Sequence, residues 1–119
     1  MAKINSFNFG FIVVDRKQYV YDIIILPDGT VKEREATKAR LGSHDIMWND
    51  VAAIVNEQPE VMVIGTGVSG LARLSAKTEE NLRQANVNLL VLPSFQAVDK
   101  FNQLVSEGKR VAALIHITC

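Results

Sequence analysis

Residues 61–70, VMVIGTGVSG, set the architecture of this chain. The first four are apolar and a glycine follows them, which is typical of a strand buried on both faces of a parallel sheet. Similar apolar runs lie downstream at residues 87–92 and 111–118, and segments with helical spacing separate the runs. This order of strand, helix, strand, helix, strand predicts right-handed βαβ units and a mainly parallel sheet.

The helices are predicted from apolar spacing and from capping residues. Apolar residues at helical spacing predict a helix from about 48 to 55, with Asp45 or Asn49 as its N-cap. A second helix is expected to begin at a Thr78 cap, because acidic residues follow it in the first turn. A third is expected to begin at a Ser94 cap and to bury one apolar face.

The first third of the chain has the alternation of antiparallel strands. Residues 7–14 alternate aromatic with small or polar side chains, and residues 19–26 are rich in aromatic and β-branched types. A Pro-Asp-Gly turn at 27–29 then returns the chain as a hairpin strand over 30–35. Charge at every position of 32–35 favours a solvated sheet edge over a binding strip.

Length and composition indicate how many domains the chain has and which partners and compartments to expect. The chain has 119 residues, which is the size of one domain, so residues 1–119 are predicted to form a single domain without a linker. Thirteen basic residues balance thirteen acidic ones, so no positive field favours nucleic acid as a partner. No apolar run is long enough to span a bilayer, and one cysteine allows no internal disulfide. A cytoplasmic protein without membrane contact is expected.

Several segments together resemble the Mth-domain family, known from adipogenesis-associated Mth-domain-containing proteins. They occur in the family's order from residue 22 to the end of the chain: Asp22-Ile23-Ile24, the turn at 27–29, residues 38–42 followed by Ser43-His44, residues 63–70, Ala97 with Phe101-Asn102, and residues 110–119. The resemblance implies a three-layer α/β fold with a mixed central sheet and an extra β layer. It also implies a possible assembly role, since one member is a mitochondrial complex I assembly factor, but no reaction, substrate or cofactor.

The glycine-rich loop after the strand at 61–64 is the first candidate site. Its spacing matches GxGxxG, yet residues 71–74 separate the third glycine from the next helix, and the acidic ribose ligand is missing. A dinucleotide is therefore not expected, and no cofactor is predicted. Backbone amides of such a loop can still form an anion-binding nest, although a tight turn that needs positive φ explains the glycines equally. The candidate ligand-binding residues are Gly65, Thr66, Gly67, Ser69, Gly70 and Ser94.

Three residues are candidate catalytic residues: His116, Cys119 and His44. Imidazole and thiolate are ligands and nucleophiles, but with one cysteine and two histidines no metal site is predicted. In a strand over 111–118, Cys119 points away from His116 unless the chain bends, and a hydrogen-bonded core histidine is the simpler reading. If His44 folds towards His116, the two form a cluster. The direction of the last strand determines whether Cys119 lies near the glycine loop.

The sequence leaves function open between two classes. The first is a non-enzymatic binding or assembly module with a protein partner, which could also hold a small anion at residues 65–70, since no carboxylate pair or activated nucleophile stands out. The second is a small enzyme that uses Cys119 or His116 beside that loop. A homodimer paired through the hairpin edge and the aromatic first strand is a further alternative.

Overall fold

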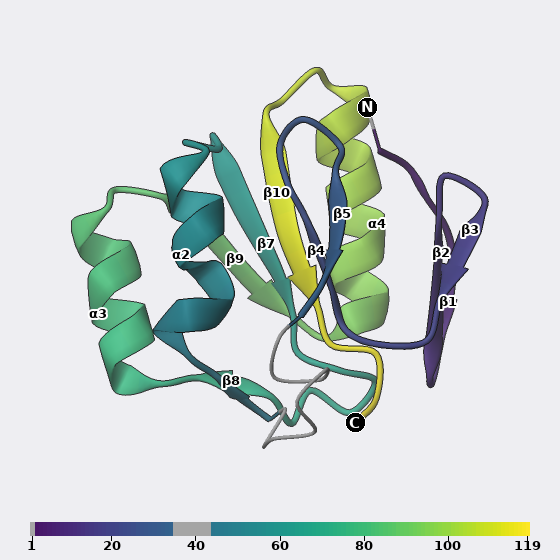
Figure 1. Cartoon of the computed structure of the whole chain (residues 1–119), viewed down its shortest axis with the longest axis horizontal. Helices are drawn as coiled ribbons and strands as arrows, with labels where there is room; N and C mark the ends of the chain where they lie inside the picture. The colour runs from purple at the N-terminus through teal and green to yellow at the C-terminus, as the bar shows by residue number, and fades with distance from the viewer. Residues whose placement is uncertain (1, 35–43) are drawn as a thin grey trace.

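The computed structural model describes residues 2–34 and 44–119. The predictions that concern Glu35, residues 38–42 and Ser43 lie outside them. A mixed sheet forms the centre, with strand order β5-β4-β10-β7-β9 (Figure 1). The strands of this sheet are β4 Ile23–Ile25, β5 Val31–Glu33, β7 Val61–Gly65, β9 Asn88–Leu92 and β10 Val111–Ile115.

The two apolar runs that alternate with helices behave as predicted at the centre of the sheet. Every residue of β7 and β10 is buried, and the two strands pair in parallel. On the other side of β7 lies β9, also parallel, whereas β4 and β5 run antiparallel to β10 and to each other. The α/β fold with a mixed central sheet is confirmed, and β9 differs from the prediction because it is an edge strand and only partly buried.

Helices and a second sheet cover the two faces of the central sheet (Figure 1). Helices α2, Trp48–Asn56, and α3, Ala76–Gln84, cover one face. Helix α4, Ser94–Ser106, covers the other, and a small antiparallel sheet packs beyond it. That sheet is the expected extra β layer, made of β1 Ile4–Asn8, β2 Phe11–Val14 and β3 Lys17–Tyr19. Each face has its own apolar core cluster, so the domain buries its sheet on both sides.

The N-terminal β unit divides differently from the prediction. The expected strand over 7–14 is two strands, β1 and β2, joined at Gly10, which takes a φ of +87°. The expected strand over 19–26 also divides, into β3 and β4, which belong to different sheets. Alternation of apolar and polar residues continues through a tight hairpin, so it does not reveal the turn. The β4–β5 hairpin after Pro27 is present as predicted.

The helices occur where predicted, but their first residues differ. Helix α2 is preceded by Met47, not by Asp45 or Asn49 as cap, and the Asp50 side chain accepts the Met47 amide. Helix α3 is capped by Ser75, and Thr78 is the residue whose amide donates to it. Both differences lie within the few residues by which sequence patterns locate helix ends. Within residues 2–34 and 44–119, no helix is long and apolar enough to cross a membrane.

Strands β6, Asp45–Ile46, and β8, Arg73–Leu74, form a short parallel pair that was not predicted. This pair lies beside the carboxyl end of the central sheet (Figure 1). Two residues are too few for an alternation pattern to be visible. The pair brings the segment after the glycine loop next to His44, because the Arg73 amide donates to the His44 carbonyl.

Candidate functional site

The carboxyl ends of β7, β9 and β10 meet at one edge of the sheet, where ligands of open α/β sheets usually bind. Since β10 runs parallel to β7, its continuation returns to the glycine loop. The Val68 amide donates to the Thr118 carbonyl over 2.7 Å, and the Leu71 amide donates to the Cys119 carbonyl over 3.0 Å. The last strand ends at Ile115 and not at residue 118 as expected, which gives the chain room to bend.

Ser94 joins the three segments through its hydroxyl. Its Oγ accepts the Gly67 amide at 2.8 Å and donates to the His116 carbonyl at 2.6 Å. The sequence predicted Ser94 as the N-cap of α4, but the helix begins at Ser94 and its cap position is Pro93. Ser94 is fully buried, so its hydroxyl fixes the loop to the C-terminal segment.

The first and second glycines of the loop allow this close approach. A Cβ at Gly65 would lie 2.8 Å from Ser94 Oγ, and a Cβ at Gly67 would lie 2.7 Å from the carbonyl oxygens of Thr118 and Cys119. Gly67 also takes a φ of +106°, which side chains rarely adopt. The first two glycines of the GxGxxG pattern therefore serve packing between the loop, α4 and the end of the chain.

Five backbone amides in and beside the predicted anion nest already donate hydrogen bonds within the protein. The amides of Thr66, Gly67, Val68, Gly70 and Leu71 all donate to acceptors of the protein itself. An anion at the loop would have to replace those acceptors, at the full cost of leaving them unpaired. Thr66 and Gly70 nevertheless line a groove on the outer side of the loop, together with Arg73.

A buried ionic network lies behind the C-terminal segment. Arg34 has no exposed surface and donates to Asp22 over 2.8 Å and to Asp50 over 3.1 Å. The Nδ1 of His116 lies 2.7 Å from the same Asp22 carboxylate. The sequence predicted a solvated edge at 32–35, which is wrong for Arg34. Its signal in the sequence was a charged residue just past a short hairpin strand, with a lone aspartate just before the partner strand β4.

Asp22 is the centre of this network. Its Oδ2 accepts from Arg34 and His116, and its Oδ1 accepts the Ile117 amide at 2.9 Å. Burial by itself raises the pKa of Asp22, but the His116 and Ile117 hydrogen bonds, the His116 charge and the Arg34 hydrogen bond outweigh it, so the pKa lies below 3.8. A charged carboxylate at neutral pH therefore anchors the residues that follow β10.

Outside the buried network, His44 and Cys119 meet at the surface. The Cys119 Sγ lies 3.8 Å from His44 Nε2, and the His44 ring packs edge-to-face on the His116 ring with centroids 5.3 Å apart. His116 is fully buried and its Nε2 lies 3.2 Å from the Thr118 hydroxyl. His44 therefore does fold towards His116, which was the condition set for a two-histidine cluster, and Cys119 lies beside His44. Among the described residues, no three His, Cys, Asp or Glu side chains are placed to hold a metal ion.

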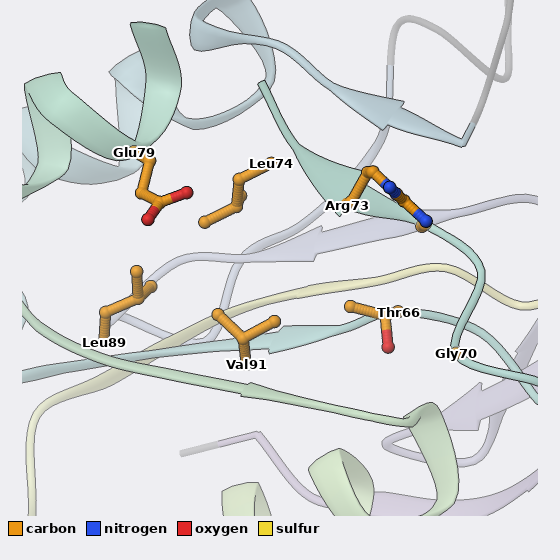
Figure 2. A pocket seen from close by; sticks show the side chains of 8 residues that line it. Thr66, Gly70, Arg73, Leu74, Glu79, Leu89 and Val91 are labelled. Atoms are coloured by element: carbon orange, nitrogen blue, oxygen red, sulfur yellow. The ribbon is translucent and has the colours of Figure 1, made fainter. Parts of the chain in front are cut away.

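A groove of about 610 Å³ runs along the outer side of β9. Ala72, Leu74, Leu89 and Val91 supply its apolar surface. Figure 2 shows Glu79 over Leu89 at one end of the groove and Arg73 beyond Val91, near Thr66, at the other. The groove therefore has an apolar floor with one acidic end and one basic end.

Among the described residues, no strand pairs with β9 on the side of this groove. The Leu92 carbonyl accepts the Thr66 amide, so Leu92 and Leu90 turn their peptide groups to β7. Successive residues of a strand alternate, and the peptide groups of Leu89 and Val91 therefore point away from the sheet. Val91 is 44% exposed and β9 contains no charged residue or proline. The sequence did not single out this strand, because residues 87–92 were predicted only as a further buried strand, without a place in the strand order.

Comparison with known proteins identifies the family. Residues 4–116 match the family model described as "Protein of unknown function (DUF498/DUF598)". A solved structure of a protein named MT938 is 30% identical over all of both chains, with a TM-score of 0.82. A structure described as an outer membrane protein from Bartonella henselae is 25% identical over 99% of this chain and 96% of that one, with a TM-score of 0.83.

A Bordetella pertussis protein described as a Mth938-like domain shares the fold. It is 20% identical, the match covers 97% of this chain and 85% of that one, and the TM-score is 0.66. The resemblance to the Mth-domain family is therefore confirmed, together with the α/β fold. The names of the family and of these proteins assign no reaction.

Proposed function

The chain belongs to the DUF498/DUF598 family of proteins of unknown function, and from that premise we propose that it is a non-enzymatic protein-interaction module whose contact surface is β9 with its groove. The observation that carries the proposal is the open, uncharged edge of β9. An extended segment of a partner can add to such an edge through main-chain hydrogen bonds, while side-chain pockets beside it give specificity.

The opposite edge of the same sheet supports this choice by contrast. Strand β5 is only three residues long and carries Lys32 and Glu33, which are features that discourage pairing with another chain. Strand β9 has five residues and none of these protections. An unprotected apolar edge beside a groove favours a binding surface, because an edge without a partner promotes aggregation.

Charge in the groove supports a preference for the docked segment. The carboxyl end of β9 lies beside Arg73, and the guanidinium of an arginine is suited to a carboxylate or a phosphate. The anion expected at the glycine loop is thus better accommodated here, next to Thr66 and Gly70. An apolar segment with one acidic group at the Arg73 end fits both features. The protein itself has a single cysteine, which favours a reducing compartment such as the cytoplasm.

The test is a titration followed by amide resonances of the labelled protein. The probes are synthetic strand-forming peptides of about six residues, rich in Val and Ile, with one Glu at the end that meets Arg73. We expect shifts at Leu89 and Val91, lost in Val91→Lys and kept in Val20→Lys, whose position is 65% exposed in the bend that follows β3. Equal binding by both variants, or no binding by any peptide, would contradict the proposal.

A second candidate, thiol chemistry, is favoured by the contact between Cys119 and His44. In an acyl transfer the His44 nitrogen would take the thiol proton, the Sγ–C bond would form, and the leaving group would depart with that proton. His116 and Asp22 would hold the His44 ring from behind. The probe is iodoacetamide, which alkylates the thiolate and releases iodide. Alkylation no faster than that of free cysteine, or unchanged in His44→Ala, would exclude this candidate.

A further inference from the structure

We infer that the strand taken up by β9 comes from a second copy of this chain, so that two β9 strands pair antiparallel around a two-fold axis through Leu90. The inference rests on the proposed function, because it names the partner of the same edge. The two central sheets would then form one continuous sheet. The strand pair expected from the sequence at the hairpin edge is replaced by a pair at the opposite edge, since β5 is short and charged.

The main chain of β9 suits this pairing. The peptide groups of Leu89 and Val91 point outward, so an axis through Leu90 sets Leu89 opposite the partner's Val91 and Val91 opposite the partner's Leu89. In an antiparallel ladder two such residues exchange both of their hydrogen bonds. Each copy therefore satisfies the outward peptide groups of the other without a shift of register.

The side chains suit the same axis. Leu89 and Val91 lie on the groove face of β9, and directly opposed apolar residues pack closely across an antiparallel pair. The exposed Val91 side chain would be covered by the partner's Leu89. Two copies of β9 can therefore pack against each other, because Leu and Val are of similar shape and neither is charged.

The charges at the two ends of the groove also become complementary. Glu79 lies over the Leu89 end and Arg73 lies at the far end, beyond Val91 (Figure 2). A two-fold axis through the middle of β9 reverses the strand, so Arg73 of each copy approaches the partner's Glu79. Within the part of the chain that the structure describes, the Glu79 carboxylate contacts Arg83 at 3.9 Å, and both side chains are exposed, so this contact is weak. The formal net charge of zero leaves no overall repulsion between copies.

The experiment is sedimentation equilibrium of the full chain over a range of concentrations. We expect a reversible dimer of the 13.2 kDa chain for the wild type, and a monomer for Val91→Lys at concentrations where the wild type is a dimer. Val20→Lys, which places the same charge on an exposed valine in the bend after β3, should keep the wild-type dissociation constant. Circular dichroism of each variant verifies that it is folded.

A charge exchange tests the register. Arg73→Glu and Glu79→Arg should each raise the dimer dissociation constant by about tenfold or more, because each sets like charges against one another. The double variant should return to within about threefold of the wild type. If both single variants raise the dissociation constant and the double variant does not return towards the wild-type value, the two-fold arrangement is overturned.

The two proposals fail differently. A wild type that remains monomeric at all concentrations, or a Val91→Lys variant that still dimerises, would overturn the second copy as the partner. The proposed function is judged separately by the peptide titration, in which Leu89 and Val91 of a monomeric protein still shift if the edge binds another chain. A wild-type dimer with recovery in the double variant would establish the inferred interface.

Discussion

Replacing Asp22 with asparagine should destabilise the fold strongly, because nearly the same shape is kept while the hydrogen-bond chemistry is reversed at one atom. Asp22 Oδ2 accepts from Arg34 at 2.8 Å and lies 2.7 Å from His116 Nδ1, while Oδ1 accepts from Ile117. If the asparagine oxygen stays with Ile117, its NH₂ group faces the donors of Arg34 and His116. If the amide is reversed, its NH₂ group faces the Ile117 amide.

Either orientation sets buried donors against one another, and each donor left without an acceptor costs about 1–3 kcal/mol of stability. It also leaves Arg34 without the charge of one carboxylate. We expect Asp22→Asn to lower the free energy of unfolding by about 3–5 kcal/mol. For a chain of this length that is a fall in Tm of roughly 10–20 °C. Urea denaturation followed by circular dichroism measures the first value and a thermal scan the second.

The control is Asp28→Asn, since Asp28 is an exposed aspartate whose Oδ1 accepts the Thr30 amide in the hairpin turn. Asparagine can accept the same bond, so a change of about 0.5 kcal/mol or less is expected. A loss of less than about 1 kcal/mol in Asp22→Asn would mean that the buried network does not hold the C-terminal segment, and the account of the site would fail.

Three further predictions concern the same edge of the sheet. The pKa of Asp22 is lowered in the fold, so its contribution to stability is present above the unfolded value of 3.8 and is lost as the pH falls through the lower folded value; acid unfolding in urea should show this loss, which Asp22→Asn should remove. Gly67→Ala should cost about 2 kcal/mol more than Gly10→Ala, because both have positive φ but only the first Cβ meets backbone, at 2.7 Å; equal costs in urea denaturation would contradict this packing. Ser94→Ala should cost about 2–3 kcal/mol, because the Gly67 amide and the His116 carbonyl lose a buried partner; a cost near zero would show that water replaces the hydroxyl.

Local patterns were enough to predict the centre of this fold. The apolar runs of β7 and β10 and the single apolar face of α4 depend on neighbouring residues alone, so they are visible without tertiary contacts. Their strand–helix alternation leads to the parallel core. The convergence of the glycine loop, Ser94 and the C-terminal segment also followed, once β10 proved to run parallel to β7.

Features that depend on distant partners were not predicted. Arg34 stands among charged residues and has the pattern of a solvated strand, because Asp22 and Asp50, which bury it, lie elsewhere in the chain. Ser94 follows Pro93 and precedes an apolar helix, as a cap would, yet its hydroxyl bonds to Gly67 and His116. Local sequence carries no information on which of two competing hydrogen-bond partners a buried side chain will take.

The edge position of β9 was missed for a related reason. An apolar run does not distinguish a strand with two neighbours from one with a single neighbour, since both bury their side chains against helices. Only the strand order reveals that Leu89 and Val91 have open peptide groups. The absence of charge in β9, set against Lys32 and Glu33 in β5, is then the informative feature of the sequence.

Hydrogen exchange at single amides of β9 examines the proposed interaction surface at the atoms involved. The Leu90 and Leu92 amides bond to β7 and should exchange slowly under all conditions, whereas those of Leu89 and Val91 should exchange quickly in the dilute protein. We predict that protection of Leu89 and Val91 rises with protein concentration, or on addition of a strand-forming peptide. Exchange at these two amides that stays fast at every concentration and with every peptide would contradict β9 as the contact surface.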